Sequence, residues 1–284
     1  MLTVLEAINR STEFLEKKNI ESPRTNAEHL LAHVLKCKRL DLYLAFDRPL
    51  KEDETDIYRE FIVRRGKREP LQYIIGSVEF FGLEFKVNPS VLIPRPETEV
   101  LVEKVLESVN KEDSLKILDI GTGSGNIAVS LAKNLSNSTL TAIDISEDAI
   151  KVAKENSELN NINGQISFYK IDFVNEQGFN ESNFDLIVSN PPYVSSEDYT
   201  ELAPELKNHE PKFALTDNND GLNFYREISK KAKASLNKNG KLFFEVGMGQ
   251  AEEVKNILLN NGFSAIEIFK DYSNIDRIVK GVVT

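Results

Sequence analysis

The segment Asn190-Pro191-Pro192-Tyr193 follows a short apolar run and combines residue types that could hold a planar amino group. Each proline fixes its own φ, and Pro192 also restricts Pro191 to extended geometry. The Pro191 carbonyl and the Asn190 side-chain oxygen would therefore offer two acceptors to one NH2 group. Tyr193 would add a flat face for the planar group. The pattern predicts a binding loop for an amide or an aromatic amine; the alternative is a rigid turn without chemistry.

The chemistry that suits such a loop is methyl transfer to nitrogen. An amide or aromatic amine is a weak nucleophile because its lone pair is delocalised. Two acceptors on its hydrogens would turn the lone pair toward an incoming methyl group and stabilise the positive charge that develops on nitrogen. Holding the nitrogen in line with a methyl sulfonium would add a proximity effect. No general base is needed before transfer, since the proton becomes acidic only afterwards.

A second candidate loop, Gly121-Thr122-Gly123-Ser124-Gly125, directly follows another apolar run. Glycines at alternate positions allow a sharp turn and a close approach to a ligand, and they set the N-terminus of the next helix against that ligand. The dinucleotide fingerprint would need a further glycine at the position of Asn126. With no pyrophosphate to hold, such a loop can pack against a carboxylate, a sulfonium or a nucleoside.

Three acidic residues follow or end apolar runs and could contact the same ligand. Asp144 could accept hydrogen bonds from both ribose hydroxyls, as the corresponding acid does in dinucleotide-binding folds. Asp119 precedes the glycine loop and either reaches the ligand or braces the loop. Asp172 could accept from an adenine amino group while Phe173 stacks on the base. The alternative for this last pair is an exposed acid beside a core ring.

Short apolar runs alternate with helical patterns from residue 116 onward. We expect strands at 116–120, 140–143, 166–169, 184–189, 241–246, 265–269 and 277–283, and helices at 124–135, 148–159, 221–236 and 250–260. The candidate loops then lie at the carboxyl ends of strands, where open α/β sheets bind ligands. The pattern predicts the α/β class, with a Rossmann-like doubly wound, mostly parallel sheet and an antiparallel C-terminal tail.

The chain before this alternation has a different character. Residues 1–75 show helical periodicity without strand-like alternation. Residues 78–81 and 83–87 are rich in β-branched and aromatic residues on either side of a glycine, which predicts a hairpin. We therefore expect three parts: a small all-helical domain at 1–75, a β-hairpin linker at 76–95 and a catalytic domain at 96–284.

The composition suits a soluble protein with a packed core. Apolar residues make up 40% of the 284, and 35 basic against 45 acidic residues give a formal net charge of −10. This balance disfavours a protein that mainly grips nucleic-acid phosphates. No apolar stretch suits a signal peptide or a membrane span, so we expect a cytoplasmic protein. Cys37 is the sole cysteine, and His29, His33 and His209 lack metal-ligand spacing, so we expect neither a disulfide nor a metal site.

Together, the glycine loop and the Asn-Pro-Pro-Tyr segment resemble the class I S-adenosylmethionine-dependent methyltransferases that modify amino groups. Further segments resemble the HemK/PrmC family of peptide chain release factor glutamine methyltransferases, namely residues 70–76, 92–99, 209–215 and 221–225. The helical N-terminal region is also similar to that family. The resemblance covers nearly the whole chain, and Ile-Pro-Arg-Pro-Glu-Thr-Glu at 93–99 is its most specific element.

The resemblance implies S-adenosylmethionine as methyl donor, S-adenosylhomocysteine as product and no metal. It implies that the donor is held by Gly121, Thr122, Gly123, Ser124, Gly125, Asp144, Asp172, Phe173 and Asn190. The family often has another aromatic residue, commonly Trp, at the position of Phe173. The acceptor would be the N5 amide nitrogen of the glutamine in the Gly-Gly-Gln motif of class 1 release factors, held by Asn190, Pro191, Pro192 and Tyr193.

The same resemblance suggests the biological setting. The helical domain would help dock the release factor, and the enzyme would act in translation termination. We expect a monomer that contacts neither nucleic acid nor membrane directly.

The principal alternative is adenine-N6 methylation of a nucleic acid, because those enzymes share the Asn-Pro-Pro-Tyr motif. It predicts a basic cleft and a domain that supports base flipping. A module that senses S-adenosylmethionine without catalysis is disfavoured by the intact Asn190 and Tyr193, and an NAD-dependent dehydrogenase by Asn126.

Two groups of charged residues have two interpretations each. The basic run of Arg64, Arg65, Lys67 and Arg68 is either a solvated helix end, where cations are favoured, or a contact for an acidic release-factor surface. Arg95 either orders the rim of the active site or pairs with a neighbouring glutamate, Glu97 or Glu99.

Overall fold

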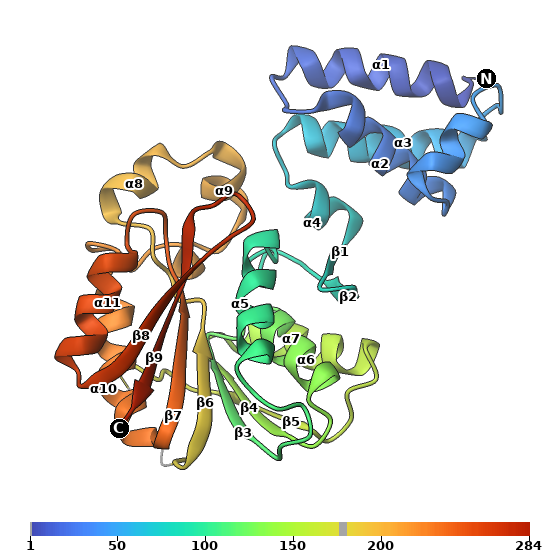
Figure 1. Cartoon of the computed structure of the whole chain (residues 1–284). Helices are drawn as coiled ribbons and strands as arrows, with labels where there is room; N and C mark the ends of the chain where they lie inside the picture. Colours follow the sequence, from blue (N-terminus) through green and yellow to red (C-terminus); the bar gives the residue numbers. More distant parts are fainter. Residues whose placement is uncertain (1, 176–180) are drawn as a thin grey trace. The chain divides into compact units, whose positions relative to one another are not determined.

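The computed structural model describes residues 2–175 and 181–284 of the chain (Figure 1). Their packing divides the chain into two compact units. The smaller, helical unit comprises Met1–Ser77 together with Ala203–His209, and the larger unit comprises Val78–Leu202 and Glu210–Thr284. Within the described residues, no helix combines the length and the apolar character needed to cross a membrane.

The helical unit confirms the predicted all-helical N-terminal region. Its elements are α1 (Val4–Lys17), α2 (Pro23–Leu35), η1 (Arg39–Leu44), α3 (Glu52–Gly66), α4 (Leu71–Ile75) and, from later in the chain, α9 (Pro204–His209). Thr3 begins α1 with a capping box, and Pro23 occupies the first turn of α2, where its missing N–H costs nothing. Apolar side chains such as Ile8, Leu15 and Leu30 are fully buried between these helices.

Ion pairs hold α9 in the helical unit. Both carboxylate oxygens of Glu205 accept from one guanidinium nitrogen of Arg68, at 3.1 and 3.2 Å. Arg65, which is 7% exposed, lies 3.5 Å from the same carboxylate and donates to the Asn26 side chain at 2.7 Å. Arg64 pairs with Glu69, so three residues of the basic run are already paired within the chain.

The paired strands expected around residues 78–87 are present, and from Val78 onward they belong to the larger unit. Strands β1 (Ser77–Phe80) and β2 (Leu83–Lys86) pair with each other. The two residues between them, Phe81 and Gly82, both have positive φ, at 51° and 71°. Two successive positive φ values are the requirement of a two-residue type I′ hairpin turn.

A seven-stranded sheet follows, in the order β5-β4-β3-β6-β7-β9-β8. The strands are β3 (Lys116–Ile120), β4 (Thr139–Asp144), β5 (Ile166–Lys170), β6 (Phe184–Ser189), β7 (Leu236–Glu245), β8 (Phe263–Lys270) and β9 (Asp276–Val283). The first five pair in parallel, whereas β9 pairs antiparallel with β7 and β8. The Rossmann-like sheet with an antiparallel tail is therefore confirmed.

Helices cover both faces of this sheet (Figure 1). They are α5 (Pro96–Glu107), α6 (Asn126–Asn134), α7 (Glu147–Leu159), α8 (Ser196–Glu201), η2 (Lys212–Ala214), α10 (Asn223–Ser235) and α11 (Ala251–Asn260). Consecutive strand residues belong to different cores: Ile117 packs with the α5 and α6 side chains, and Leu118 with those of α10 and α11. Burial on both faces explains why these strands are apolar throughout rather than alternating.

The strand order creates one topological switch point. Strand β3 lies between β4 and β6, so successive connections leave it in opposite directions along the sheet. In open α/β sheets, such a point leaves a crevice at the carboxyl ends of the strands, and ligands bind there. The segments that follow β3, β4 and β6 are the three that carry the glycine loop, Asp144 and the Asn-Pro-Pro-Tyr segment.

Two details differ from the sequence expectations. Strand β7 begins at Leu236 rather than at 241, because Leu236 pairs with Phe184 before a register shift in the ladder. The region 194–220, for which we had no expectation, contains two short helices and a 3-10 turn.

Candidate active site

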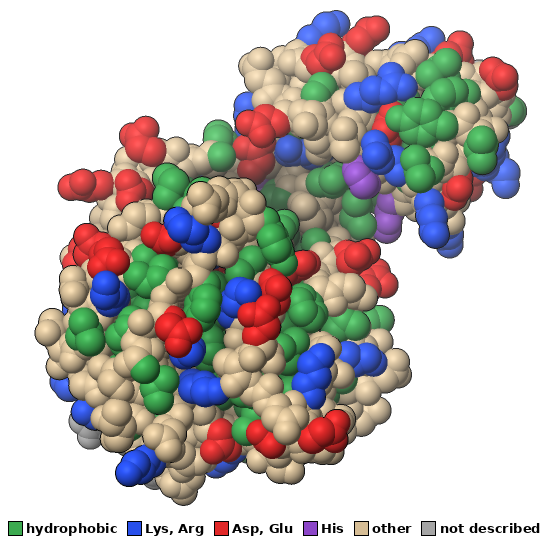
Figure 2. Space-filling view, in the orientation of Figure 1, with side chains coloured by type: hydrophobic (Ala, Val, Ile, Leu, Met, Phe, Trp, Pro, Cys, Tyr) green, Lys and Arg blue, Asp and Glu red, His purple; other side chains and the backbone are tan. Residues whose placement is uncertain are grey.

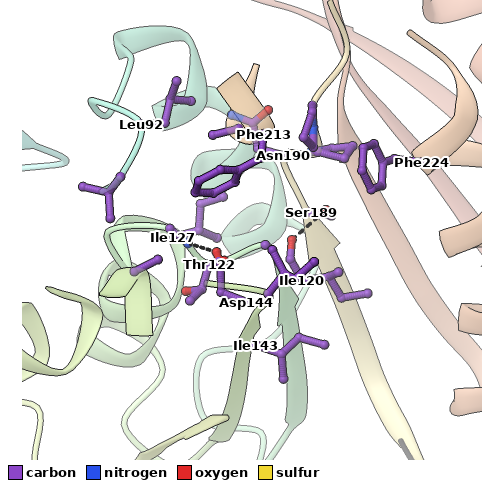
Figure 3. A pocket seen from close by; sticks show the side chains of 18 of the residues that line it. Leu92, Ile120, Thr122, Ile127, Ile143, Asp144, Ser189, Asn190, Phe213 and Phe224 are labelled. Carbon is purple, nitrogen blue, oxygen red and sulfur yellow. Dashed lines mark hydrogen bonds between the residues drawn. The ribbon is translucent and has the colours of Figure 1, made fainter. Parts of the chain in front are cut away.

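A cavity lies at the carboxyl ends of β3, β4 and β6 (Figure 3). The predicted site residues that line it are Gly121, Thr122, Gly123, Ser124, Asp144, Asp172, Phe173, Asn190, Pro191 and Pro192. In Figure 3, Asn190, Phe213 and Phe224 lie toward one end of the view, and Thr122, Asp144 and Ile143 toward the other. Both candidate loops therefore face one cavity within the larger unit.

The glycine loop follows a backbone path that its glycines permit. Gly121, Gly123 and Gly125 have φ values of 73°, 55° and 80°, in the left-handed region that other residues rarely adopt. A Cβ on Gly125 would lie 3.0 Å from the side chain of Ala153 in α7. This glycine therefore serves helix packing behind the loop, while the other two shape its cavity-facing part.

Asp144 is held by the backbone of the loop beside it. Its two carboxylate oxygens accept from the N–H groups of Gly123, at 2.9 Å, and Ser146, at 2.8 Å. The side chain is 7% exposed, and burial raises its pKa even though these hydrogen bonds oppose the shift. Each oxygen has a second lone pair, so the carboxylate can still accept from a ligand.

Asp119 is completely buried behind the same loop. One of its oxygens accepts from the Thr122 hydroxyl at 2.7 Å, which is the bracing role considered above. The other has no hydrogen-bond partner among the described residues. Burial, reinforced by the nearby charge of Asp144, raises the pKa of Asp119 to about 7. Two desolvated carboxyls side by side favour a cationic ligand, which would stabilise their ionised forms.

Asp172 and Phe173 line the cavity from the segment after β5. The Asp172 carboxylate accepts from the backbone N–H groups of Val174, at 3.1 Å, and Asn175, at 2.9 Å, and so stabilises the turn. Burial raises its pKa, but hydrogen bonds from the Asn175 side chain and from these N–H groups, with the charge of Lys231, outweigh burial and lower the pKa overall. Phe173 is 5% exposed, packs into the core and also lines the cavity.

Asn190 begins the second loop immediately after β6. Its side-chain NH2 donates to the hydroxyl of Thr98 at 3.2 Å. Thr98 is 2% exposed and lies in the first turn of α5, which begins at Pro96. The sequence analysis did not identify Thr98 as a site residue, although it belongs to the segment most specific to the family.

Three further residues fix the loop from behind, and the sequence analysis assigned a role to none of them. The Gln250 side chain donates to the Tyr193 carbonyl at 2.9 Å and accepts from the Gly247 N–H at 3.0 Å. A Cβ on Gly221 would lie only 2.4 Å from the same Tyr193 carbonyl. In the sequence, only Gly221 and Gly247 hinted at a close backbone approach. Which residues approach them depends on the fold and could not be predicted.

The aromatic faces of the cavity are not those expected. Tyr193 is not among the described residues that line it, and its ring packs against the core beneath α10 and α11. Burial there raises the pKa of Tyr193 to about 12, so it stays neutral at ordinary pH. Besides Phe173, the rings that line the cavity are Phe213 and Phe224 (Figure 3).

Arg95 pairs with neither of its sequence neighbours that we considered. It donates to Glu210 at 2.5 Å, and Glu210 also accepts from the Ile93 N–H at 3.3 Å. Glu99 instead accepts from the Phe81 N–H at 2.8 Å. Because Arg95 lines the cavity, the ion pair fastens the segment before η2 to the cavity rim, which agrees with the ordering role.

The fold, with the glycine loop and the Asn-Pro-Pro-Tyr loop at one cavity, defines a Rossmann-like methyltransferase. A methyltransferase from Pyrococcus furiosus shares this fold, with a TM-score of 0.52 and 22% identity over 72% of this chain and 90% of that one. Residues 96–215 match the methyltransferase small domain, and residues 6–76 match the PrmC N-terminal domain.

Two relatives match nearly the whole chain. It is 42% identical to the release factor glutamine methyltransferase of Thermodesulfovibrio yellowstonii over 97% of each sequence. It is 44% identical to the release factor glutamine methyltransferase of Fusobacterium nucleatum, over 97% of this chain and 77% of the relative. The chain therefore belongs to the family of release factor glutamine methyltransferases, which confirms the resemblance found in the sequence.

Proposed function

We propose that this methyltransferase transfers the methyl group of S-adenosylmethionine to the side-chain amide nitrogen of the glutamine in the Gly-Gly-Gln motif of class 1 release factors. One observation carries the proposal: the cavity lined by the glycine loop and Asp144 is also lined by Asn190 and Pro191. A donor site and a grip for a planar NH2 group therefore share one space.

The donor would be held by the glycine loop, Asp144, Asp172 and Phe173. The residues present fit it, because the buried carboxyls of Asp119 and Asp144 favour a cationic ligand and the ring of Phe173 offers an apolar face. When bound, S-adenosylmethionine supplies an electrophilic methyl group on a sulfonium. The role of the protein on this side is to hold that group still and to exclude water from it.

The acceptor would be held by Asn190 and Pro191. Because the Asn190 NH2 donates to Thr98, its side-chain oxygen is left to accept from a substrate N–H. The Pro191 carbonyl would accept from the second N–H of the same amide. Two acceptors on one nitrogen oppose the delocalisation of its lone pair and stabilise the positive charge that develops during transfer. The proton then leaves the alkylated nitrogen without a dedicated base.

Glutamine is favoured over adenine by the charge of the molecule. The formal net charge is −10. On the face drawn in Figure 2, the described Lys and Arg side chains are interspersed with Asp and Glu rather than gathered into a basic band. A nucleic acid would need such a band to bind its phosphates. A release factor does not need a basic band for binding. On this proposal the helical unit helps to dock it, and the reaction takes place in the cytoplasm.

The test is mass spectrometry of a purified class 1 release factor after incubation with the enzyme and S-adenosylmethionine. The proposal predicts the mass gain of one CH2 group on the Gly-Gly-Gln peptide, located at the glutamine side chain. A release factor with that glutamine replaced by alanine is the matched control and should stay unmodified. Methyl groups in duplex DNA or RNA offered in parallel, with none in the release factor, would overturn the proposal in favour of adenine methylation.

A further inference from the structure

A buried glutamate lies beside Asn190 at the edge of the sheet. Strands β6 and β7 are parallel, and Ser189 pairs with Phe244 in their register. The next residues along the chain are Asn190, which follows β6, and Glu245, which ends β7. Glu245 is 1% exposed, and it is not among the described residues that line the cavity. It therefore cannot act by touching a substrate.

The surroundings of Glu245 lead to the candidate active site. The side chains of Thr98 and Asn190 lie near its carboxyl group and favour the ionised form. The Asn190 NH2 also donates to the Thr98 hydroxyl. The three side chains are thus neighbours, and one carboxyl oxygen of Glu245 is buried with no hydrogen-bond partner among the described residues.

The surrounding charged groups do not neutralise this carboxyl group. Arg277 of β9 donates instead to Asp271, at 3.2 Å, and to the Val246 carbonyl, also at 3.2 Å. Glu97 of α5 adds like charge. The neutral phenols of Tyr193, in the Asn-Pro-Pro-Tyr loop, and Tyr225, in α10, complete the surroundings. Burial raises the pKa of Glu245 to about 7, against the influence of Thr98, Arg277 and Asn190.

An ionised carboxylate accepts hydrogen bonds and cannot donate them. A neighbour that faces it must therefore present a donor, which for an asparagine amide is the nitrogen end. The Thr98 hydroxyl must likewise point its hydrogen at the carboxylate, which leaves its lone pairs to accept from Asn190. Without a partner that only accepts hydrogen bonds, the side-chain amide can rotate by half a turn, so that its oxygen and nitrogen exchange positions.

We infer that Glu245, acting with Thr98, is a positioning residue that sets which end of the Asn190 amide faces the acceptor nitrogen. This inference rests on the proposed function, in which the Asn190 oxygen receives a substrate N–H. In a reversed amide, the Asn190 NH2 would face the NH2 of the substrate, so two donors would meet. The hydrogen bond that holds the glutamine in the transition state would be lost.

The first experiment compares wild type with Glu245→Gln. Glutamine has nearly the same shape but carries both a donor and an acceptor, so it no longer dictates the amide orientation. We expect kcat at saturating donor and release factor to fall roughly 10- to 100-fold, below the effect of deleting a transition-state hydrogen-bond partner outright. The Kd for S-adenosylmethionine, measured by calorimetry, should stay within about threefold. A kcat equal to that of wild type would overturn the inference.

The pH profile gives a readout that a merely structural role would not move. In wild type, kcat should rise as the pH increases through about 7, since ionisation of Glu245 produces the acceptor-only form. In Glu245→Gln, this limb should disappear. Asp119 titrates in the same range. Because it lies behind the glycine loop, its ionisation should affect donor binding, and saturating donor therefore minimises its influence on kcat. Persistence of the limb in the variant would contradict the inference.

A second pair of variants covers the possibility that Glu245→Gln folds poorly. Thr98→Ser keeps the hydroxyl and should retain most of the activity, whereas Thr98→Val keeps the shape, loses the hydroxyl and should reproduce the loss in kcat. Equal kcat values for these two variants would refute the role of the hydroxyl in orienting Asn190.

A measurement without turnover separates this inference from the proposed function. The NMR signals of the Asn190 side-chain NH2, assigned with an Asn190→Ala sample, should shift with a midpoint near pH 7 in wild type and not in Glu245→Gln. Failure of wild type to methylate the release factor would end the proposed function, while these signals would still report on the coupling. Signals insensitive to pH in wild type would overturn the inference even in an active enzyme.

Discussion

The two sides of the cavity are built in different ways. The proposed donor side, residues 121–125 with Asp144, is one turn of backbone and the strand end beside it, joined by main-chain N–H groups. The proposed acceptor side, residues 190–193, depends on side chains from distant segments, Thr98 and Gln250 among them. A local turn fixes the first, whereas the packing of the whole larger unit fixes the second. Changes far along the chain should therefore affect acceptor positioning more than donor binding.

The largest effect that separates the two sides is expected from Asn190→Ala. On the proposed function, it removes a hydrogen-bond acceptor that contributes mainly to holding the substrate nitrogen, although the family resemblance also places Asn190 beside the donor. We expect kcat to fall by roughly 100- to 1000-fold, as for a lost transition-state hydrogen bond. The Kd for S-adenosylmethionine, measured by calorimetry, should change by less than about threefold. A large loss of donor affinity without a loss of kcat would reverse the assignment of the two sides.

The matching change on the donor side is Asp144→Ala. It removes the carboxylate that holds the Gly123 N–H and that would receive the donor's ribose. A charged hydrogen-bonding group of this kind contributes about 1.5–3 kcal/mol, so the Kd for the donor should rise roughly 10- to 100-fold. At saturating donor, kcat should be nearly unchanged. Asp144→Asn, which keeps one acceptor oxygen, is the control and should fall between the two.

Each side also contains a buried carboxyl group, and their effects on stability can be compared. Asp119 and Glu245 each have a pKa raised to about 7, mainly by burial. A raised pKa in the folded state gives stability that is present below the ordinary pKa and is lost as the pH rises through about 7. The free energy of unfolding should therefore decrease between pH 5 and pH 8, by about 1–3 kcal/mol for each group.

Urea unfolding at both pH values tests this expectation. Asp119→Asn and Glu245→Gln should each remove part of the decrease, and the double variant should remove more than either single one. A pH dependence identical to that of wild type in both variants would show that the two carboxyls are already ionised in the folded protein at pH 5.

The smallest effect is expected from the ion pairs of the basic run, one of which holds α9, in the segment between Tyr193 and Phe213. Arg64 pairs with Glu69, and Arg68 with Glu205, whereas Lys67 is exposed and forms no ion pair with the described residues. Arg68→Glu should destabilise the enzyme by up to about 1 kcal/mol, because the pair is partly solvated. Chemical denaturation measures this change.

The combined variant Arg68→Glu with Glu205→Arg should recover most of that stability. Lys67→Glu should leave stability unchanged and should raise KM for the release factor only if the basic run contacts it. If the combined variant is no more stable than Arg68→Glu alone, the Arg68–Glu205 pair does not stabilise α9.

The sequence predicted the backbone geometry of the proposed donor side well, because that geometry depends on local sequence. Glycines at alternate positions directly after an apolar run predict a turn with positive φ, and Gly121, Gly123 and Gly125 adopt it. The parallel sheet followed from the same apolar runs. Asp144 could be placed because a strand end and the turn beside it meet at one edge of the sheet.

The proposed acceptor side could be predicted only in part. The Asn-Pro-Pro-Tyr loop was recognisable as contiguous sequence. Its hydrogen-bond partner Thr98 and its neighbour Glu245 lie 92 and 55 positions away, and they meet it only through the packing of α5 and the β6–β7 register. Tyr193 illustrates the same limit. The sequence shows that it has a flat ring, but not whether that ring faces the cavity or the core. Gln250 and Gly221, which hold that residue from behind, carry no local signal of their task.

The most direct test of the account is a crystal structure of the enzyme with S-adenosylhomocysteine and a peptide that contains Gly-Gly-Gln. The account predicts that the glutamine nitrogen lies about 3 Å from both the Asn190 side-chain oxygen and the Pro191 carbonyl, the distance of an ordinary hydrogen bond. A glutamine nitrogen beyond hydrogen-bond reach of both oxygens, or an Asn190 amide whose NH2 faces the peptide, would contradict it.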